Sequence, residues 1–357
     1  MTLAATGEYQ SLDKVLTGAH RSPLAKDASH KIIEVDDPSP VNSVAFLRDE
    51  EKIVGGGDEG MLRYWNVKDG RQAGAASCGD GVLTIAVSKD GQRIVCGAKS
   101  GLVTVWDTTT QRKVVEIKGH TYWVVAVDVS PDSRTVGTAS YDGAASIWDM
   151  TTGQLLVSLL RASSGAALVA LKFSTDGSRV ATSPFSQNSV GIRDTQNGRL
   201  LANISVGLSS NGNEPTVALA WSNDDQQLFA VSHDGNIHCF DTSTGCLLSK
   251  WPIHSGCQPA TIALSNNGKF IVASADSSIS FWDVSTHSQI GPVITHPGSV
   301  QSIALSSDDR CLVSGGRTGK KVIVWNLRNV LPDPYHFIPA GKSAVRNITK
   351  LFSSTAI

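Results

Sequence analysis

The chain has 357 residues, and its 31 Lys and Arg residues nearly balance 32 Asp and Glu residues. A formal net charge of −1 excludes a chain-wide basic field that would attract nucleic acid or an acidic membrane surface. The hydrophobic content of 41% and the 33 glycines predict a globular core with many tight turns.

The first residues lack a basic leader with an apolar core, and no later stretch reaches the roughly 20 apolar residues of a membrane span. We therefore expect a protein of the cytoplasm or the nucleus with no membrane partner. Six scattered cysteines without a Cys-x-x-Cys pair favour reduced thiols, mostly in the core. They are Cys78, Cys96, Cys239, Cys246, Cys257 and Cys311.

A unit of about 40 to 45 residues recurs along the chain from about residue 30. Each copy contains an alternating apolar run, a Ser-containing turn, a second apolar run, a short turn, and a third run that ends at Trp-Asp or a replacement. The seven ends are Trp65-Asn66, Trp106-Asp107, Trp148-Asp149, Arg193-Asp194, Phe240-Asp241, Trp282-Asp283 and Trp325-Asn326. Alternation without helical periodicity predicts an all-β body.

The turns between the first and second runs support the same reading. Six of them begin with Ser, at residues 88–91, 130–133, 174–177, 222–225, 265–268 and 306–309. Asp, Asn and Gly in these turns tolerate left-handed backbone conformations, so the segments are predicted to be hairpins between strands.

The third copy is the clearest, and it runs from Gly119-His120 through residues 124–127, 130–132 and 138–143 to Trp148-Asp149. Over residues 30–327 the chain resembles the WD-repeat β-propeller family, in particular the arrays common in fungi. The resemblance implies one four-stranded blade for each copy, and therefore a seven-bladed propeller.

A propeller must join its last blade to its first, because an open end would leave a strand edge unpaired. Residues 31–35 have the pattern of residues 113–117, which in this family form the outermost strand of the preceding blade. We predict that residues 31–35 pair with residues 321–325, so that an N-terminal strand closes the ring in the last blade. Residues 14–17 and 335–338 are the alternatives.

Two terminal segments lie outside this ring. Residues 1–29 are expected to form a flexible arm, and residues 328–357 a C-terminal tail. One helical face of the tail would carry Ala344, Val345, Ile348, Leu351 and Phe352. The segment is either a short partner-binding helix or a frayed terminus.

Four residues of the third copy, His120, Ser140, Asp142 and Trp148, include the residue types of a hydrolytic triad. The chain has no Gly-x-Ser-x-Gly nucleophile turn, which argues against a catalytic role. The resemblance implies instead a structural hydrogen-bond network, in which the His links the turn Asp to a hydroxyl and an indole.

Two glycine-rich segments suggest phosphate binding at first sight. Residues 315–321 have the wrong glycine spacing, and Lys321 stands where Ser or Thr would hold magnesium. Residues 55–60 also lie between two strands, so both segments are predicted to be hairpin turns. A dense group of possible metal ligands has no zinc-type spacing; it comprises His238, Cys239, Cys246, His254 and Cys257. We expect no enzyme activity, cofactor or metal.

The resemblance implies that partners bind on the top face of the propeller, at the turns between the second and third strands and at the entry to the first. Mapping copy by copy assigns to this face Asp58, Lys99, Tyr122, Trp123, Tyr141, Phe185, His233, Ala275 and Arg317. Exposed aromatic residues near an Arg have the composition of binding hot spots. Trp123 alternatively packs between blades.

The fourth copy departs most from the pattern, with an unusual turn at 183–188 and Arg193 in place of Trp. Together with the longer connection at 208–215, this predicts that blades four and five form the specialised region of the surface. The sequence thus predicts a non-enzymatic scaffold or adaptor that binds other proteins or peptides, as a monomeric propeller within a larger complex and without nucleic acid. A reader of methylated lysine with a top-face aromatic cage is the alternative. For that role Asp58 is not close to the aromatic residues in blade order.

Overall fold

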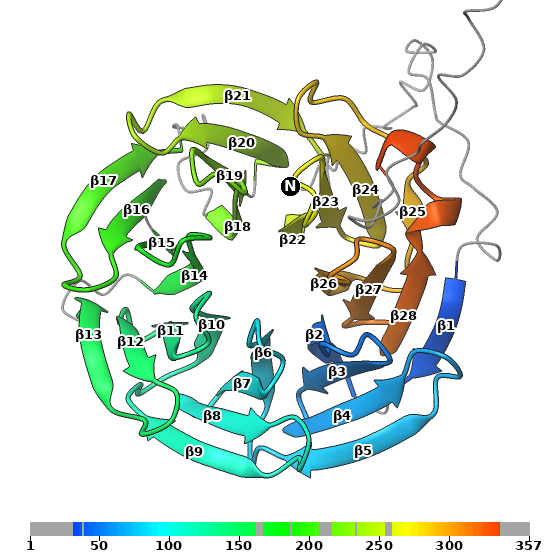
Figure 1. Cartoon of the computed structure of the whole chain (residues 1–357), viewed down its shortest axis with the longest axis horizontal. Helices are drawn as coiled ribbons and strands as arrows, with labels where there is room; N and C mark the ends of the chain where they lie inside the picture. Colours follow the sequence, from blue (N-terminus) through cyan, green and yellow to red (C-terminus); the bar gives the residue numbers. More distant parts are fainter. Residues whose placement is uncertain are drawn as a thin grey trace, which may run out of the picture.

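The computed structural model describes residues 31–37, 39–161, 167–185, 188–206, 216–232, 234–253 and 259–335. In these residues the strands form seven four-stranded antiparallel sheets that stand around a central axis (Figure 1). The structure confirms the predicted all-β, seven-bladed propeller. We name the strands of each blade a to d from the axis outward.

The first four blades each contain four strands that are consecutive in the chain. Blade 1 consists of β2 (Val41–Phe46), β3 (Lys52–Gly57), β4 (Met61–Asn66) and β5 (Gln72–Ser77). Blade 2 consists of β6 (Val82–Val87), β7 (Arg93–Ala98), β8 (Leu102–Asp107) and β9 (Lys113–Lys118). Blade 3 consists of β10 (Val124–Val129), β11 (Thr135–Ser140), β12 (Ala145–Asp149) and β13 (Leu155–Leu160). Blade 4 consists of β14 (Leu168–Phe173), β15 (Arg179–Pro184), β16 (Ser189–Asp194) and β17 (Leu200–Ser205).

Blades 5 and 6 also consist of consecutive strands, whereas the last blade takes its outermost strand from the start of the described chain. Blade 5 consists of β18 (Thr216–Trp221), β19 (Gln227–Ser232), β20 (Asn236–Asp241) and β21 (Leu247–Pro252). Blade 6 consists of β22 (Pro259–Leu264), β23 (Phe270–Ala275), β24 (Ser278–Asp283) and the short β25 (Ile294–Thr295). Blade 7 consists of β26 (Val300–Leu305), β27 (Cys311–Gly316), β28 (Lys321–Asn326) and β1 (Lys31–Asp36).

β1 closes the ring by antiparallel pairing with β28, in a register that places Glu34 opposite Ile323 and Asp36 opposite Lys321. The Glu34 carboxylate also lies 2.6 Å from the Lys321 ammonium group. In Figure 1 the two strands run side by side on the outer rim. The predicted closing strand is therefore confirmed. The alternative segment 14–17 lies outside the described residues, as does 335–338 except for Tyr335, which belongs to a short helix.

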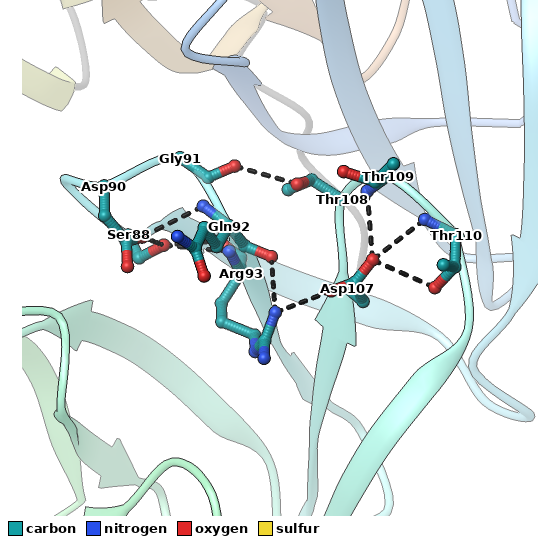
Figure 2. A network of polar contacts seen from close by, with 9 residues as sticks. All are labelled: Ser88, Asp90, Gly91, Gln92, Arg93, Asp107, Thr108, Thr109 and Thr110. Atoms are coloured by element: carbon teal, nitrogen blue, oxygen red, sulfur yellow. Dashed lines mark hydrogen bonds and ion pairs between the residues drawn. The ribbon is translucent and has the colours of Figure 1, made fainter.

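Side chains in the turns fix the ends of the strands. The Ser88 hydroxyl donates to Asp90 at 2.6 Å and accepts the backbone N–H of Arg93 at 2.9 Å (Figure 2). Asp107, at the end of strand c, accepts the backbone N–H of Thr110 at 2.8 Å and pairs with the Arg93 guanidinium at 2.6 Å. The serine contact recurs at Ser130, Ser174, Ser222, Ser265 and Ser306. These contacts explain why Ser recurs at the a–b turns and Asp at the end of strand c.

In six blades the aromatic residue near the end of strand c packs against the preceding blade. These residues are Trp65, Trp106, Trp148, Phe240, Trp282 and Trp325. Blade 4 has Arg193 at this position, and its guanidinium donates to the Gly198 carbonyl at 3.3 Å. The core between blades 3 and 4 is formed instead by smaller side chains and Phe173.

The a strands of all seven blades surround a channel on the axis. Its lining includes one or more residues from each, among them Asn42, Thr84, Val125, Val169, Ala218, Thr261 and Gln301. The channel position agrees with the ring seen in Figure 1.

After β28 the chain folds back against blades 6 and 7 through two short helices, η3 (Leu327–Asn329) and η4 (Asp333–Tyr335). Leu327 and Leu331 are buried in the core of these blades. The Tyr335 hydroxyl donates to Asp283 at 2.7 Å. The expected arm at 1–29 and the helical face at 344–352 lie outside the described residues. No helix in the described ranges has the length and apolar character needed to cross a membrane.

Candidate functional site

The turns of the propeller alternate between two faces, because the four strands of a blade are antiparallel. We call the face with the b–c turns and the d–a connections the upper face; it is the predicted top face. The opposite face carries the a–b and c–d turns, and we call it the lower face.

His120 is buried at the entry to blade 3 and contacts two polar side chains. Its Nδ1 lies 3.1 Å from the Asp142 carboxylate, and its Nε2 lies 2.7 Å from the Thr138 hydroxyl. The Trp148 indole N–H donates to the same hydroxyl at 2.9 Å. The network therefore joins the entry of strand a to strands b and c of one blade.

Ser140 is not the hydroxyl at the centre of this network, which corrects the sequence prediction. Its Oγ donates to the Tyr122 carbonyl at 3.0 Å and accepts the backbone N–H of Asp142 at 3.0 Å. No hydrogen bond joins Ser140 to His120, so the three residue types do not form a Ser-His-Asp relay.

The strand register explains why Thr138 replaces Ser140. Trp148 on β12 lies opposite Val136 on β11, so Thr138 is the diagonal neighbour that an indole can reach on the same face of the sheet. Ser140 lies on that face too, but two residues further along the strand. Either hydroxyl satisfies the sequence pattern, and only the pairing distinguishes them.

The charge state of the network follows from its surroundings. Burial lowers the pKa of His120, although the neighbouring Asp142 carboxylate acts in the opposite direction. Burial would raise the pKa of Asp142, but backbone N–H groups of Thr121 and Ala144 and the His120 ring hold it below its usual value. At neutral pH the network therefore combines a neutral imidazole with an ionised carboxylate.

Tryptophans in other blades also donate to a hydroxyl, but from a varying strand. The pairs are Trp106 with Thr104, Trp282 with Ser280 and Trp325 with Ser314, at 2.8 to 2.9 Å. In blade 7 strand b supplies the hydroxyl, as in blade 3, whereas in blades 2 and 6 strand c supplies it. In these two blades the strand-b position holds Cys96 or Ala273.

Blade 5 builds a different histidine contact. His238 on β20 stacks on Phe240 at 5.9 Å, and its Nε2 lies 3.1 Å from Asp234, which also pairs with Lys250 at 2.6 Å. The sequence pattern indicated His238 only as a possible metal ligand. The sequence signal for this contact is the Asp four residues before His238, in the b–c turn that precedes β20.

Three aromatic rings stack on the upper face of blade 3. The ring centroids of Tyr122 and Trp123 are 5.6 Å apart, and those of Trp123 and Tyr141 are 5.8 Å apart. The ring planes are nearly parallel, at 14° and 18°. Tyr122 is half exposed and Trp123 partly exposed, so Trp123 belongs to the surface stack rather than to the core between blades.

Lys99 in blade 2 connects this stack to blade 1. Its ammonium nitrogen lies 5.9 Å from the Trp123 ring centroid and 2.9 Å from the Asp58 carboxylate. Asn42 donates to the same carboxylate at 2.9 Å. Asp58 is thus linked to the aromatic residues through Lys99, although it lies two blades away. We call Asp58, Lys99, Tyr122, Trp123 and Tyr141 the upper-face strip.

Two groups of the strip have perturbed acidity. Burial by itself would raise the pKa of Asp58. Hydrogen bonds from Lys99 and Asn42 and the positive charges of Lys99 and Arg317 outweigh this effect, so the pKa lies below its usual value. Burial raises the pKa of Tyr141, so its hydroxyl remains neutral. The strip therefore presents an ion pair beside neutral, stacked rings.

The other residues predicted for the upper face differ in their exposure to solvent. Phe185 is about half exposed on blade 4, and Arg317 is exposed on blade 7. Ala275 is buried and cannot meet a partner. His233 lies outside the described residues.

The described residues include no group of three or more His, Cys, Asp or Glu side chains that could hold a metal ion. The glycine-rich segments at 55–60 and 315–321 connect β3 to β4 and β27 to β28, so both are b–c hairpins.

Two protein-family models match the chain. The model described as WD domain, G-beta repeat matches residues 30–66 and 288–326, which contain β1 to β4 and β25 to β28. The model described as outer membrane protein assembly factor BamB matches residues 58–290, from the end of β3 to blade 6. No curated protein sequence matches the chain significantly.

Proposed function

Since the chain belongs to the WD-repeat β-propeller family, within the wider class of repeat propellers that includes the BamB model, we propose that it is a non-catalytic scaffold for partner proteins. The partners bind at the upper-face strip. The observation that carries this proposal is the exposed stack of Tyr122, Trp123 and Tyr141, which Lys99 joins to Asp58. Rigid aromatic groups beside charges are typical of interface hot spots.

Hydrogen bonds fix the backbone of the stacked residues in the chain without a partner. The Tyr122 carbonyl accepts the Ser140 hydroxyl, and the backbone N–H of Tyr141 donates to the Trp123 carbonyl at 2.9 Å. Little conformational entropy remains to be lost on binding, which favours affinity. A matching partner segment places an apolar side chain on the exposed Tyr122 ring and polar groups at the tyrosine hydroxyls.

Reading of methylated lysine remains a prediction from the sequence. The three rings are nearly parallel, whereas a cage would surround a cation with several ring faces. The cation beside Trp123 is the chain's own Lys99. These contacts support general protein binding more strongly than selective binding of a modified lysine.

A comparative interaction experiment tests the scaffold proposal. Proteins that co-purify with the wild-type chain from native extract are quantified against those of the double variant Tyr122→Ala with Tyr141→Ala. The exposed Leu248 on the outer strand of blade 5 provides the control Leu248→Ala. We expect at least a tenfold loss of specific partners with the double variant alone. Equal recovery with all three proteins would remove the strip as the binding surface.

A further inference from the structure

A groove of about 450 Å³ lies between blades 3 and 4 on the lower face. Its size falls in the range of about 300 to 1,000 Å³ that is typical of ligand sites. Its lining includes Thr135, Leu156, Phe173 and Thr195, together with the acidic residues Asp132 and Asp176. No residue of the upper-face strip takes part in it.

The neighbouring gap, between blades 4 and 5, contains an arginine side chain of the protein itself. Arg179, the first residue of β15, places its guanidinium carbon 5.0 Å from the Trp221 ring centroid. The guanidinium donates to the Asp225 carbonyl at 2.8 Å and to the Thr242 hydroxyl at 3.2 Å. An aromatic face, a turn carbonyl and a threonine hydroxyl thus bind one guanidinium group.

The groove between blades 3 and 4 has the counterpart of each of these three groups. They are the ring of Phe173 at the end of β14, the carbonyl of Gly177 and the hydroxyl of Thr195, all of which belong to lining residues. The Thr195 hydroxyl donates to the Gly177 carbonyl at 2.8 Å, and the Thr242 hydroxyl donates to the Asp225 carbonyl at the same distance. The local geometry of the two gaps therefore corresponds.

The side chain that would fill the groove is missing from blade 3. The first residue of β11 is Thr135, whereas the first residue of β15 is Arg179. Between blades 2 and 3, the position that corresponds to Thr195 holds Met150, which is buried. Between blades 3 and 4 both positions hold a short side chain, Thr135 and Thr195. The ring, the carbonyl and the hydroxyl therefore remain in place while the space that an arginine would fill stays open.

The charge of the groove also matches a cation. Asp132 and Asp176 are both exposed and accept the hydroxyls of Ser130 and Ser174 in their own turns. Among the described residues neither carboxylate forms an ion pair within 4 Å, although the charge of Arg179 acts on Asp176. The side chains of Leu155 and Leu156, about half exposed, lie on the adjacent outer strand β13. An arginine next to an apolar residue would satisfy both features.

We propose that this groove binds an arginine side chain of a partner protein. The guanidinium lies over Phe173, donates to the Gly177 carbonyl and the Thr195 hydroxyl, and pairs with the two aspartates. An apolar residue beside the arginine packs on Leu156. This interaction is separate from the proposed scaffold function of the upper face, so either can fail without the other.

A dipeptide titration tests the recognition chemistry. The probe is acetyl-leucyl-arginine amide, and its uncharged control replaces arginine with citrulline; binding to the full chain is followed by saturation-transfer NMR. We expect saturable binding that is at least tenfold weaker for citrulline. The combined change Asp132→Asn and Asp176→Asn should reduce this preference below threefold. Asn267 occupies the corresponding turn in blade 6 and accepts the Ser265 hydroxyl at 2.9 Å, so the replacement fits the turn.

Two exchanges between the sister gaps test the location. Thr135→Arg places the missing side chain in the groove and should abolish peptide binding, with a melting temperature equal to or above that of the wild type. Arg179→Thr should open the second gap and add a second binding site. The absence of saturable binding in the wild type, equal binding of citrulline, or unchanged binding by Thr135→Arg would each overturn the proposal.

The same titration identifies other occupants. If the peptide dissociates a dimer in sedimentation, a second copy fills the groove. If it accelerates tryptic cleavage at Arg346, the chain's own C-terminal segment fills it. Either result would overturn the assignment to a partner protein.

Discussion

The Trp148 indole N–H and the Thr138 hydroxyl form a 2.9 Å hydrogen bond between two buried side chains of adjacent strands. A buried indole donor requires an acceptor, because an unpaired one costs about 1 to 3 kcal/mol. Equivalent tryptophans in blades 2, 6 and 7 also donate to a hydroxyl, from either strand b or strand c. The hydrogen bond is thus retained while the residue that accepts it varies.

Thr138→Val should destabilise the protein by about 2 kcal/mol or more, because it removes the partner of both Trp148 and His120. Ser140→Ala should cost less, since its hydroxyl bonds only to backbone groups of Tyr122 and Asp142, which lie in surface segments, and to no buried side chain. Urea denaturation of both variants measures the difference in the free energy of unfolding. A larger loss for Ser140→Ala would contradict the assignment of Thr138 to the centre of the network.

In blade 6, a hydroxyl on strand b should be able to replace the one on strand c as the acceptor of the Trp282 indole N–H. Ser280→Ala leaves the Trp282 indole without its acceptor and should lower the free energy of unfolding by about 1 to 3 kcal/mol. Ala273 on β23 holds the position that corresponds to Thr138 in blade 3. Adding Ala273→Ser to the first variant should recover at least half of the loss in the same assay. No recovery would show that the strand-b position cannot reach this indole.

The blade number and the closing strand were predictable because they depend on local patterns. Serine turns, alternating strands and the similarity of residues 31–35 to residues 113–117 each concern a few neighbouring residues. Pairing of β1 with β28 then follows from the need to close the sheet. The number of blades and the pairing of the closing strand do not depend on the exact orientation of neighbouring blades.

The contacts between blades were not predictable in the same way. Thr138 and Ser140 share one face of β11, and only the pairing with β12 selects Thr138. The link from Asp58 through Lys99 to Trp123 depends on the relative positions of three blades. The groove beside Thr135 and Thr195 likewise results from two short side chains that are 60 residues apart in the sequence but meet at one gap.

The stability of blade 3 should decrease as the pH falls below neutrality. Burial lowers the pKa of His120 from its usual value of 6.5, so the unfolded chain takes up a proton at higher pH than the folded one does. Stability is therefore complete above about pH 6.5 and is lost as the pH falls toward the folded-state value. Unfolding at pH 7.5, 6.0 and 5.0 would measure this loss. His120→Gln should be less stable at pH 7.5 and show a shallower decline; an unchanged pH profile would assign the decline to other groups.

Ring closure should depend on the backbone of β1 far more than on its surface ion pair. Ile33→Pro removes the backbone N–H of the residue opposite Val324 on β28 and fixes its φ angle, so the pairing of β1 should weaken. We expect a loss of about 1 to 3 kcal/mol in the free energy of unfolding, the cost of a backbone hydrogen bond that is no longer made. Glu34→Gln breaks the partly exposed ion pair with Lys321 and should cost less than about 1 kcal/mol. Thermal and urea unfolding of the two variants, which differ by one position in the chain, provide the comparison. Similar small losses for both would mean that blade 7 is stable with three strands, and that β1 is not required to hold the ring together.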